Sequence, residues 1–258
     1  MSDTVIRLRH LYPDLLNLYG DRANVLALRR RCEWRGIRFE AEGVGIGERF
    51  DPSSCDIVLL GGGQDAEQEK VGRDLADGNG DAVREAVEAG VVFLCVCGGL
   101  QMMGRFYRTA SGETVPGLGA IDLETHAGAV RMIGDVVGCS EPLQLSGRDP
   151  ILVGFENHAG KTRLGPGVRP LAIVGRGHGN NGEDRTEGAV YKNTYCTYLH
   201  GGLLPKNPDL ADHLLAIAVK RQYGPEMCAF DKPGELDEPF SENARKFYPL
   251  ANRSKFHR

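Results

Sequence analysis

Apolar and polar residues follow two rhythms along the first hundred positions. Apolar runs at 5–11, 37–41, 56–60 and 91–96 predict strands. Between them, apolar residues recur at helical spacing over 22–35, 66–89 and 98–107; Asp21 is expected to cap the first helix, and Gly78 to break the second. Apolar strands that alternate with helices are typical of parallel βαβ units. The pattern therefore predicts an α/β fold with a mainly parallel sheet flanked by helices.

After Gly112 the pattern changes to short β-like runs separated by glycine-rich turns. These runs, which predict antiparallel additions, lie at 119–123, 130–137, 151–156, 171–174, 189–191 and 194–199. A final helix is expected from Pro208, with Asn207 as its cap and Gly224 just past its end. We therefore divide the chain into one domain at 1–228 and a proline-punctuated basic tail at 229–258, which we expect to be solvated or bound to a partner.

Charge and length exclude several classes of function. The 258 residues carry a formal charge of −4, which argues against a general nucleic-acid binder. The longest apolar stretch falls short of the roughly 20 residues that span a bilayer, and the first residues lack the pattern of a signal peptide. The seven cysteines are scattered without a C-x-x-C pair, which disfavours disulfides and a metal site. We expect a cytoplasmic protein that binds no metal.

The first candidate for chemistry is Cys97, in CVCGGLQ at 95–101. A buried strand that turns directly into a helix at a cysteine resembles a nucleophile elbow. The helix N-terminus would lower the pKa of the thiol, and the amide of Gly98 would face a developing oxyanion. The alternative is that Cys97 is a small core residue, the commonest role of an intracellular cysteine.

Two further segments could complete such a site. The glycines at 61–63 follow a predicted strand, where bare amides could provide a second oxyanion donor; a plain glycine turn is the alternative. A phosphate loop is excluded because neither G-x-x-x-x-G-K-[ST] nor G-x-G-x-x-G is present. A cysteine nucleophile also needs a base. His200, at the end of a predicted strand, is the first candidate, and His158 is the second.

These segments together carry a resemblance to a known family. The elbow, the glycines at 61–63 and the segment YLHG at 198–201 are similar to class I glutamine amidotransferase domains of the cobyric-acid-synthase-like branch. Within it, the chain most resembles the glutaminases that serve a separate Mur-ligase-like subunit, MurT, in the amidation of lipid II. The similar stretches, within 5–223, are YPDLLNLYGD (12–21), GFENH (154–158), GNNG (179–182), TYLHG (197–201) and LPKNP (204–208).

The resemblance implies a flavodoxin-like fold and a set of roles. Cys97 would attack the carboxamide of L-glutamine, His200 would be its general base, and Gly62 and Gly98 would form the oxyanion hole. Gln101 would line the glutamine pocket, and Arg131 would bind glutamine. No cofactor is expected on this chain, because it shows no nucleotide motif; ATP and magnesium would belong to the MurT-like partner, which would also carry lipid II.

One position departs from the wider superfamily. Class I enzymes with a triad usually place a glutamate two residues after the histidine, where this chain has Gly202. We therefore hypothesise that the partner supplies the orienting acid and that the isolated chain is a slow glutaminase. Three alternatives stay open: a glutaminase for another acceptor such as a corrinoid, a stand-alone cysteine hydrolase, and a non-catalytic module.

Overall fold

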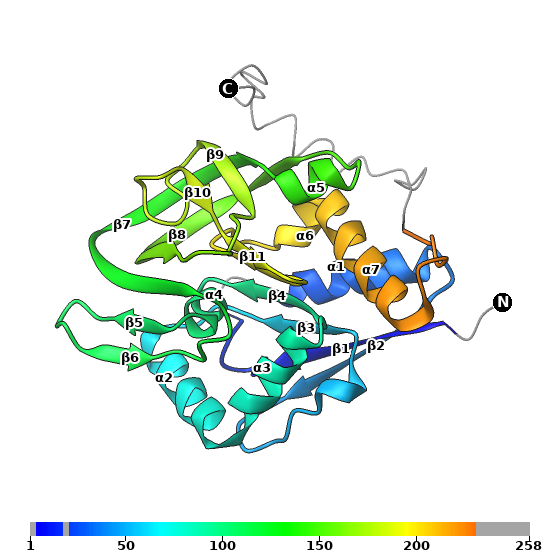
Figure 1. Ribbon diagram of the computed structural model, residues 1–258, viewed down its shortest axis with the longest axis horizontal. Coiled ribbons are helices and arrows are strands. Elements are labelled where there is room, and N and C mark those ends of the chain that lie inside the picture. Colours follow the sequence, from blue (N-terminus) through cyan, green and yellow to red (C-terminus); the bar gives the residue numbers. More distant parts are fainter. Residues whose placement is uncertain (1–3, 18–20, 231–258) are drawn as a thin grey trace.

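A six-stranded sheet forms the centre of the molecule. The computed structural model describes residues 4–17 and 21–230 (Figure 1). The strands are β1 (Val5–Leu11), β2 (Arg38–Val44), β3 (Ile57–Leu60), β4 (Val92–Val96), β11 (Ala189–Tyr191) and β12 (Thr194–Thr197). Their order is β11-β12-β4-β3-β1-β2, and every pair is parallel except β11 with β12. The five parallel strands follow the 2-1-3-4-5 order of flavodoxin-like sheets, which confirms the predicted fold class.

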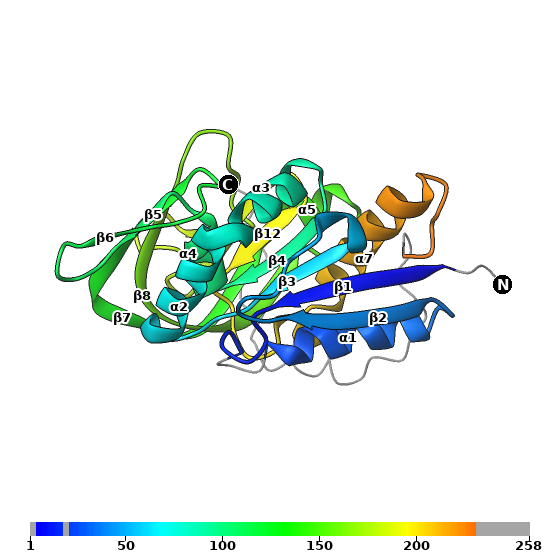
Figure 2. The same cartoon turned by 90° about the horizontal axis from the view of Figure 1, so that it is seen from below.

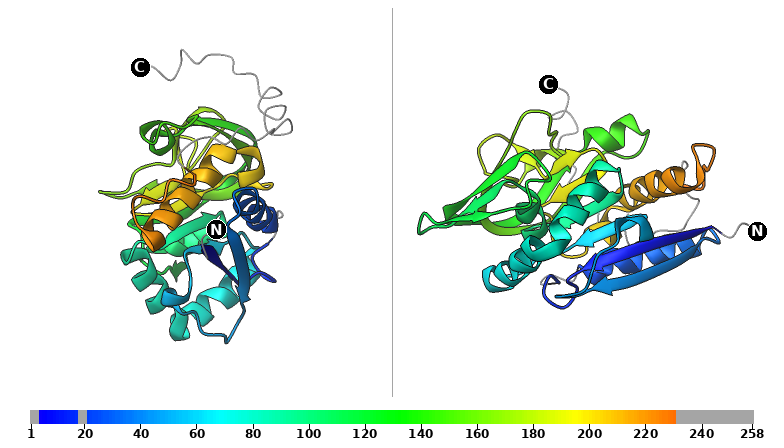
Figure 3. Two further views of the ribbon diagram at one scale, coloured as in Figure 1. Left: turned by 90° about the vertical axis from the view of Figure 1, so that its right-hand side faces the viewer. Right: turned by 60° about the horizontal axis from the view of Figure 1, so that its bottom comes forward.

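Helices cover both faces of this sheet (Figures 2 and 3). On one face, α1 (Arg22–Glu33), α6 (Leu203–Lys206) and α7 (Pro208–Tyr223) pack on Ile57 and Leu59 of β3. On the other, α2 (Asp65–Asp74), η2 (Leu75–Asn79), α3 (Gly80–Glu88) and α4 (Gly98–Met103) pack on Val58 and Leu60. A strand buried on both sides sends alternate residues into the two layers, which is why these runs contain few polar residues.

The long predicted helix at 66–89 is broken where expected. Gly78 leaves the helical region, with φ 173° and ψ −43°, inside the π-helical turn that joins α2 to α3. The remaining short elements are a 3₁₀ turn, η1 (Pro52–Ser54), and α5 (Glu141–Leu145). In the described ranges 4–17 and 21–230, no helix has the length and apolar character needed to cross a bilayer.

The strands within 106–187 form a separate sheet beside the first (Figure 1), whereas the later strands β11 and β12 belong to the central sheet. The strands of the separate sheet are β5 (Phe106–Arg108), β6 (Thr114–Pro116), β7 (Leu123–Cys139), β8 (Ile151–Leu164), β9 (Ala172–Arg176) and β10 (Thr186–Glu187). The long antiparallel β7–β8 pair contains the two short strands predicted at 130–137 and 151–156. The segment 119–123 is not a strand: it reaches β7 only at Leu123.

The predicted helix at 98–107 is too long by four residues. It ends at Met103, because Gly104 is extended and Arg105 donates its amide to the carbonyl of Leu123. Phe106–Arg108 then pairs in parallel with β7. The apolar residues that suggested a continuing helix therefore begin the second sheet instead.

Buried polar contacts hold the helices of the first face together. Asp212 of α7 accepts two hydrogen bonds from the Arg31 guanidinium, at 2.5 and 2.7 Å, and one from Arg35 at 2.9 Å. The expected cap residue Asn207 makes no side-chain cap bond among the described residues; its amide group bonds instead to the backbone of Val153, at 2.9 and 2.8 Å. Of the predicted tail, 229–230 lie in the described part, where Phe230 is buried, and 231–258 lie outside it.

Candidate active site

Cys97 lies at the turn between β4 and α4. Its backbone takes φ 50° and ψ −102°, a conformation that L-residues rarely adopt. Its amide donates to the carbonyl of Thr197 at 2.8 Å, which ties the turn to β12. A β-carbon built on Gly99 would lie 2.3 Å from the carbonyl oxygen of Leu60, so the helix can start this close to β3 only with glycine there. This is the geometry of a nucleophile elbow.

Gly62 and His200 lie on either side of that elbow. They follow β3 and β12, the two strands that flank β4. A β-carbon built on Gly62 would lie 3.3 Å from Cβ of Cys97 and 3.5 Å from Cε1 of His200. The amide of His200 donates to the carbonyl of Phe155 at 2.7 Å, which holds this strand end against β8. The structure thus brings together three residues that are far apart in the sequence, at the carboxyl edge of the sheet.

Gln101 lies on α4 one turn beyond Cys97. It is buried, and its side-chain amide donates to the hydroxyl of Tyr198 at 3.2 Å. The Tyr198 hydroxyl also bonds to Thr162 at 2.7 Å, and its ring stacks on the ring of His158 with centroids 3.6 Å apart. Gln101 is therefore held in one orientation by a buried polar network rather than exposed along an open groove.

Arg131 lies on β7, where the pairing with β8 shifts register between Ala127 and Met132. Such a bulge turns side chains out of the regular pleat. Its side chain is exposed, and its Nε donates to the Asn157 side-chain oxygen at 2.5 Å. The positive charge acts on both Cys97 and His200, lowering the pKa of each. The guanidinium thus lies near the other predicted residues and remains accessible to an anionic group.

The charge state of Cys97 differs from the sequence prediction. Burial and, next, the carboxylate of Asp21 together raise the pKa of the Cys97 thiol to about 12, although the amide of Gly98 acts to lower it. The predicted lowered pKa is therefore wrong for this chain alone, because desolvation outweighs the helix terminus. Burial lowers the pKa of His200 to about 4, with contributions from His158 and Arg131. A protonated thiol beside a neutral imidazole is the pairing in which the imidazole can act as a base.

Three buried carboxylates near the site are not among the predicted site residues. Asp21 accepts a hydrogen bond from the amide of Gly62 at 3.0 Å. Glu156 accepts from the backbone and ring of His178, and one of its oxygens lies 3.8 Å from Nε2 of His158. Glu187 accepts from the Thr197 hydroxyl, and burial raises its pKa to about 7. In sequence, such residues cannot be distinguished from solvated acids.

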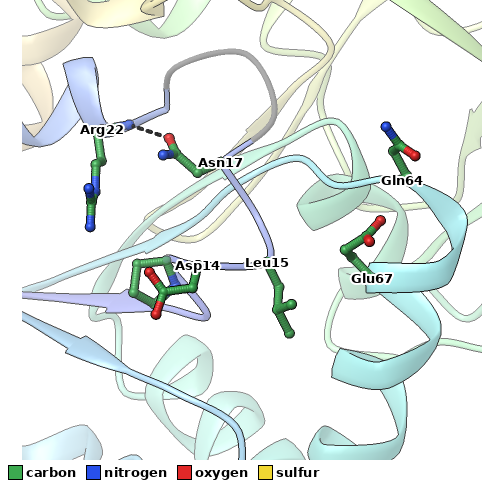
Figure 4. Close-up of a pocket in the computed structure, with 7 residues that line it drawn as sticks. Asp14, Leu15, Asn17, Arg22, Gln64 and Glu67 are labelled. Carbon is green, nitrogen blue, oxygen red and sulfur yellow. Dashed lines mark hydrogen bonds between the residues drawn. The ribbon is translucent and has the colours of Figure 1, made fainter.

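A cavity of about 470 Å³ adjoins the glycine-rich loop (Figure 4). It is lined by Pro13, Asp14, Leu15, Asn17, Arg22, Gln64 and Glu67. These residues come from the segment before α1, from its first residue, Arg22, and from the start of α2, and none of them is a predicted site residue. The cavity therefore lies beside the Cys97 site and does not coincide with it.

Comparisons with known proteins show which family the chain belongs to. The family model of the CobB/CobQ-like glutamine amidotransferase domain matches residues 7–208. The chain belongs to this family and is a glutamine amidotransferase. Two relatives match almost end to end, both named lipid II isoglutaminyl synthase (glutamine-hydrolyzing) subunit GatD. The Staphylococcus aureus protein is 38% identical over 95% of this chain and 96% of its own. The Streptococcus pneumoniae protein is 36% identical over 97% and 94%.

More distant proteins share the fold. The structure of PurLQS from Thermotoga maritima superposes with a TM-score of 0.56 at 16% identity, covering 84% of this chain and 99% of that one. A glutamine amidotransferase from the same organism gives 0.55 at 14% identity, covering 93% and 90%. A cobyric acid synthase from Pelotomaculum thermopropionicum is 30% identical over 72% of this chain but only 35% of its own length.

Proposed function

We propose that the chain is the glutaminase subunit of a two-protein enzyme that amidates lipid II. It would hydrolyse L-glutamine and supply ammonia to a separate Mur-ligase-like subunit of the MurT type, which would amidate D-glutamate of the stem peptide. The observation that carries the proposal is the convergence of Cys97 and His200 on Gly62. The near-complete match to two GatD subunits, against a partial match to cobyric acid synthase, favours lipid II over a corrinoid as the acceptor system.

The proposed reaction uses the neutral pair described above. His200 takes the thiol proton as the sulfur of Cys97 attacks the side-chain carbonyl carbon of glutamine. The amides of Gly62 and Gly98 receive the oxyanion of the tetrahedral intermediate. When that intermediate collapses, His200 returns the proton to departing ammonia and then activates the water that releases glutamate from the thioester.

Substrate binding is assigned to two other residues. Arg131 would hold the α-carboxylate of glutamine through parallel hydrogen bonds from its planar guanidinium. Gln101, held by Tyr198, would form the wall beside the carboxamide. The accessibility of the Arg131 guanidinium and the influence of its charge on Cys97 support this assignment.

The partner supplies what this chain lacks in sequence. Gly202 occupies the position of the usual orienting acid, so we propose that docking provides a carboxylate for His200. ATP and magnesium belong to the partner, since this chain carries no nucleotide motif. The proposal assigns the reaction to the cytoplasm, where ATP is present and the scattered cysteines stay reduced.

Glutamate release from L-glutamine tests the proposal. The full chain should hydrolyse glutamine slowly alone and faster with the purified partner. Cys97→Ser should abolish release in both cases, whereas Cys228→Ser, at an exposed cysteine, should leave it unchanged. Activity that survives Cys97→Ser would overturn the proposed nucleophile. Full activity without the partner would overturn the idea that docking completes the site.

A further inference from the structure

We propose that Asp21 is an internal gate of the glutaminase site. Its carboxylate accepts a hydrogen bond from the Gly62 amide, which the oxyanion needs as a donor. The carboxylate must release that amide before glutamine is hydrolysed. The inference rests on the proposed function and adds to it a control of the same site. It concerns a residue that the sequence predicts to be an ordinary helix cap.

The contact places a negative charge at the centre of the site. Asp21 is 1% exposed, and its Oδ2 lies 3.0 Å from the amide nitrogen of Gly62. Gly62 is also the residue whose built β-carbon would touch both Cys97 and His200. A tetrahedral oxyanion needs an amide that is free to donate. A carboxylate oxygen already bound there therefore competes directly with the reaction.

The approach is close enough to be specific. A β-carbon built on Gly61 would lie 2.9 Å from Oδ2 of Asp21 and 2.0 Å from the carbonyl oxygen of Leu16. The segment before α1 thus packs directly on the backbone of the glycine-rich loop, and it can do so only because Gly61 has no side chain. The glycines at 61–63 serve two purposes, since they expose an amide and admit the carboxylate that covers it.

The same carboxylate has a second place to go. Asp21 precedes α1, a helix of twelve residues, where an aspartate normally accepts hydrogen bonds from the first-turn amides. Within the described part of the chain, its side chain makes no such bond, and its backbone is helical (φ −58°, ψ −23°) instead of extended. A change at this one residue would move the carboxylate from Gly62 to the start of α1, where the helix dipole stabilises a negative charge. The gate therefore has two alternative positions.

The negative charge of Asp21 opposes the reaction, as its hydrogen bond to Gly62 does. Burial raises the pKa of Asp21 to about 6, against the effect of the Gly62 hydrogen bond, so the group is still ionised at neutral pH. After burial, its charge is the largest cause of the raised pKa of the Cys97 thiol. The closed gate thus blocks an oxyanion donor and also disfavours the thiolate.

Two substitutions separate these effects in the full chain without its partner. Asp21→Ala removes both the charge and the hydrogen-bond acceptor of the Gly62 amide. Asp21→Asn removes the charge but keeps an oxygen that can accept from Gly62. Asp14→Ala, at an exposed carboxylate of the same segment, is the matched control. The readouts at neutral pH are glutamate release and the rate at which iodoacetamide alkylates Cys97, located by mass spectrometry, with thermal unfolding to confirm folding.

Both Asp21 variants should alkylate faster, by about tenfold if the pKa of the thiol falls by one. Glutamate release should rise more in Asp21→Ala than in Asp21→Asn, and Asp14→Ala should match the wild type. Slower or unchanged alkylation and release in both folded Asp21 variants would overturn the gate. Faster alkylation in a chain that hydrolyses no glutamine even after the purified partner is added would uphold control of the thiol by Asp21 and overturn the proposed function.

Discussion

Adding one methyl group at Gly62 should stop catalysis without unfolding the chain. In Gly62→Ala the new β-carbon would lie 3.3 Å from Cβ of Cys97 and 3.5 Å from Cε1 of His200, contacts that small shifts can relieve. The methyl group would nevertheless fill the space between nucleophile and base and push the oxyanion away from the Gly62 amide. Loss of one oxyanion donor lowers kcat by about 10²–10³, or about 2.7–4 kcal/mol. We expect a loss of that size.

The assay is glutamate release by the chain together with its partner, with thermal unfolding measured on the same samples. Gly72→Ala is the matched control, because a β-carbon built on Gly72, in α2, meets no described atom within 4 Å apart from its chain neighbours and the backbone of its own helix. It should keep its rate and gain about 0.5–1 kcal/mol of stability from helix propensity. A folded Gly62→Ala enzyme that retains more than half of the wild-type kcat would refute the placement of the reaction at Gly62.

Three further changes test separate parts of the account. Arg131→Lys should raise the KM for glutamine by about tenfold or more and change kcat little, since lysine loses the bidentate carboxylate contact; a fall in kcat alone would count against a binding role. Asp212→Asn should lower the free energy of unfolding in a urea titration by about 3–5 kcal/mol, because it leaves the Arg31 charge buried without its ionic partner. Glu33→Gln, at a surface ion pair, is the control and should change that free energy by about 0–1 kcal/mol. Burial raises the pKa of Glu187 from 4.5 to about 7. Between pH 4.5 and about 7 the folded chain therefore keeps a proton on Glu187 that the unfolded chain releases. The contribution of Glu187 to the free energy of unfolding falls as the pH rises through this range. Glu187→Gln should remove this fall. The measurement is the difference in unfolding free energy between variant and wild type at each end of that pH range. A variant whose stability depends on pH as the wild type's does would contradict the prediction.

The parallel sheet could be predicted because its strands carry their own signal. Ile57–Leu60 is apolar at every position, and both of its faces are buried between helices. The elbow was equally visible, because a buried strand, a cysteine and two glycines are adjacent in the chain. Features set by neighbouring residues are therefore recovered well from the sequence.

The second sheet was harder because glycine has more than one use. Gly138 and Gly154 lie within long paired strands, and their built β-carbons would meet Ala172 at 3.0 Å and Leu199 at 2.7 Å. Gly138 allows close packing against the neighbouring strand β9, Gly154 allows it against the segment after β12, and neither glycine forms a turn. Because a glycine in a turn and a glycine in a closely packed strand look the same in the sequence, the pattern predicts short fragments where the structure has the long β7–β8 pair.

The contact of Asp21 could not be predicted for a different reason. An aspartate before a helix is explained locally by capping, and that explanation leaves no reason to look for a partner 41 residues away. The raised pKa of the Cys97 thiol follows from the same contact together with burial. Local rules place Cys97 at the turn between β4 and α4, whereas the charge state of its thiol depends on a tertiary contact.

The most direct test of the central claim uses the chain in complex with the proposed Mur-ligase-like partner. With Cys97→Ala, amidation of lipid II driven by glutamine should vanish, while amidation driven by added ammonium salt should persist at the wild-type rate. That result would show that Cys97 serves only to release ammonia. Loss of both activities in a folded complex, or glutamine-driven amidation that survives without the thiol, would contradict the account.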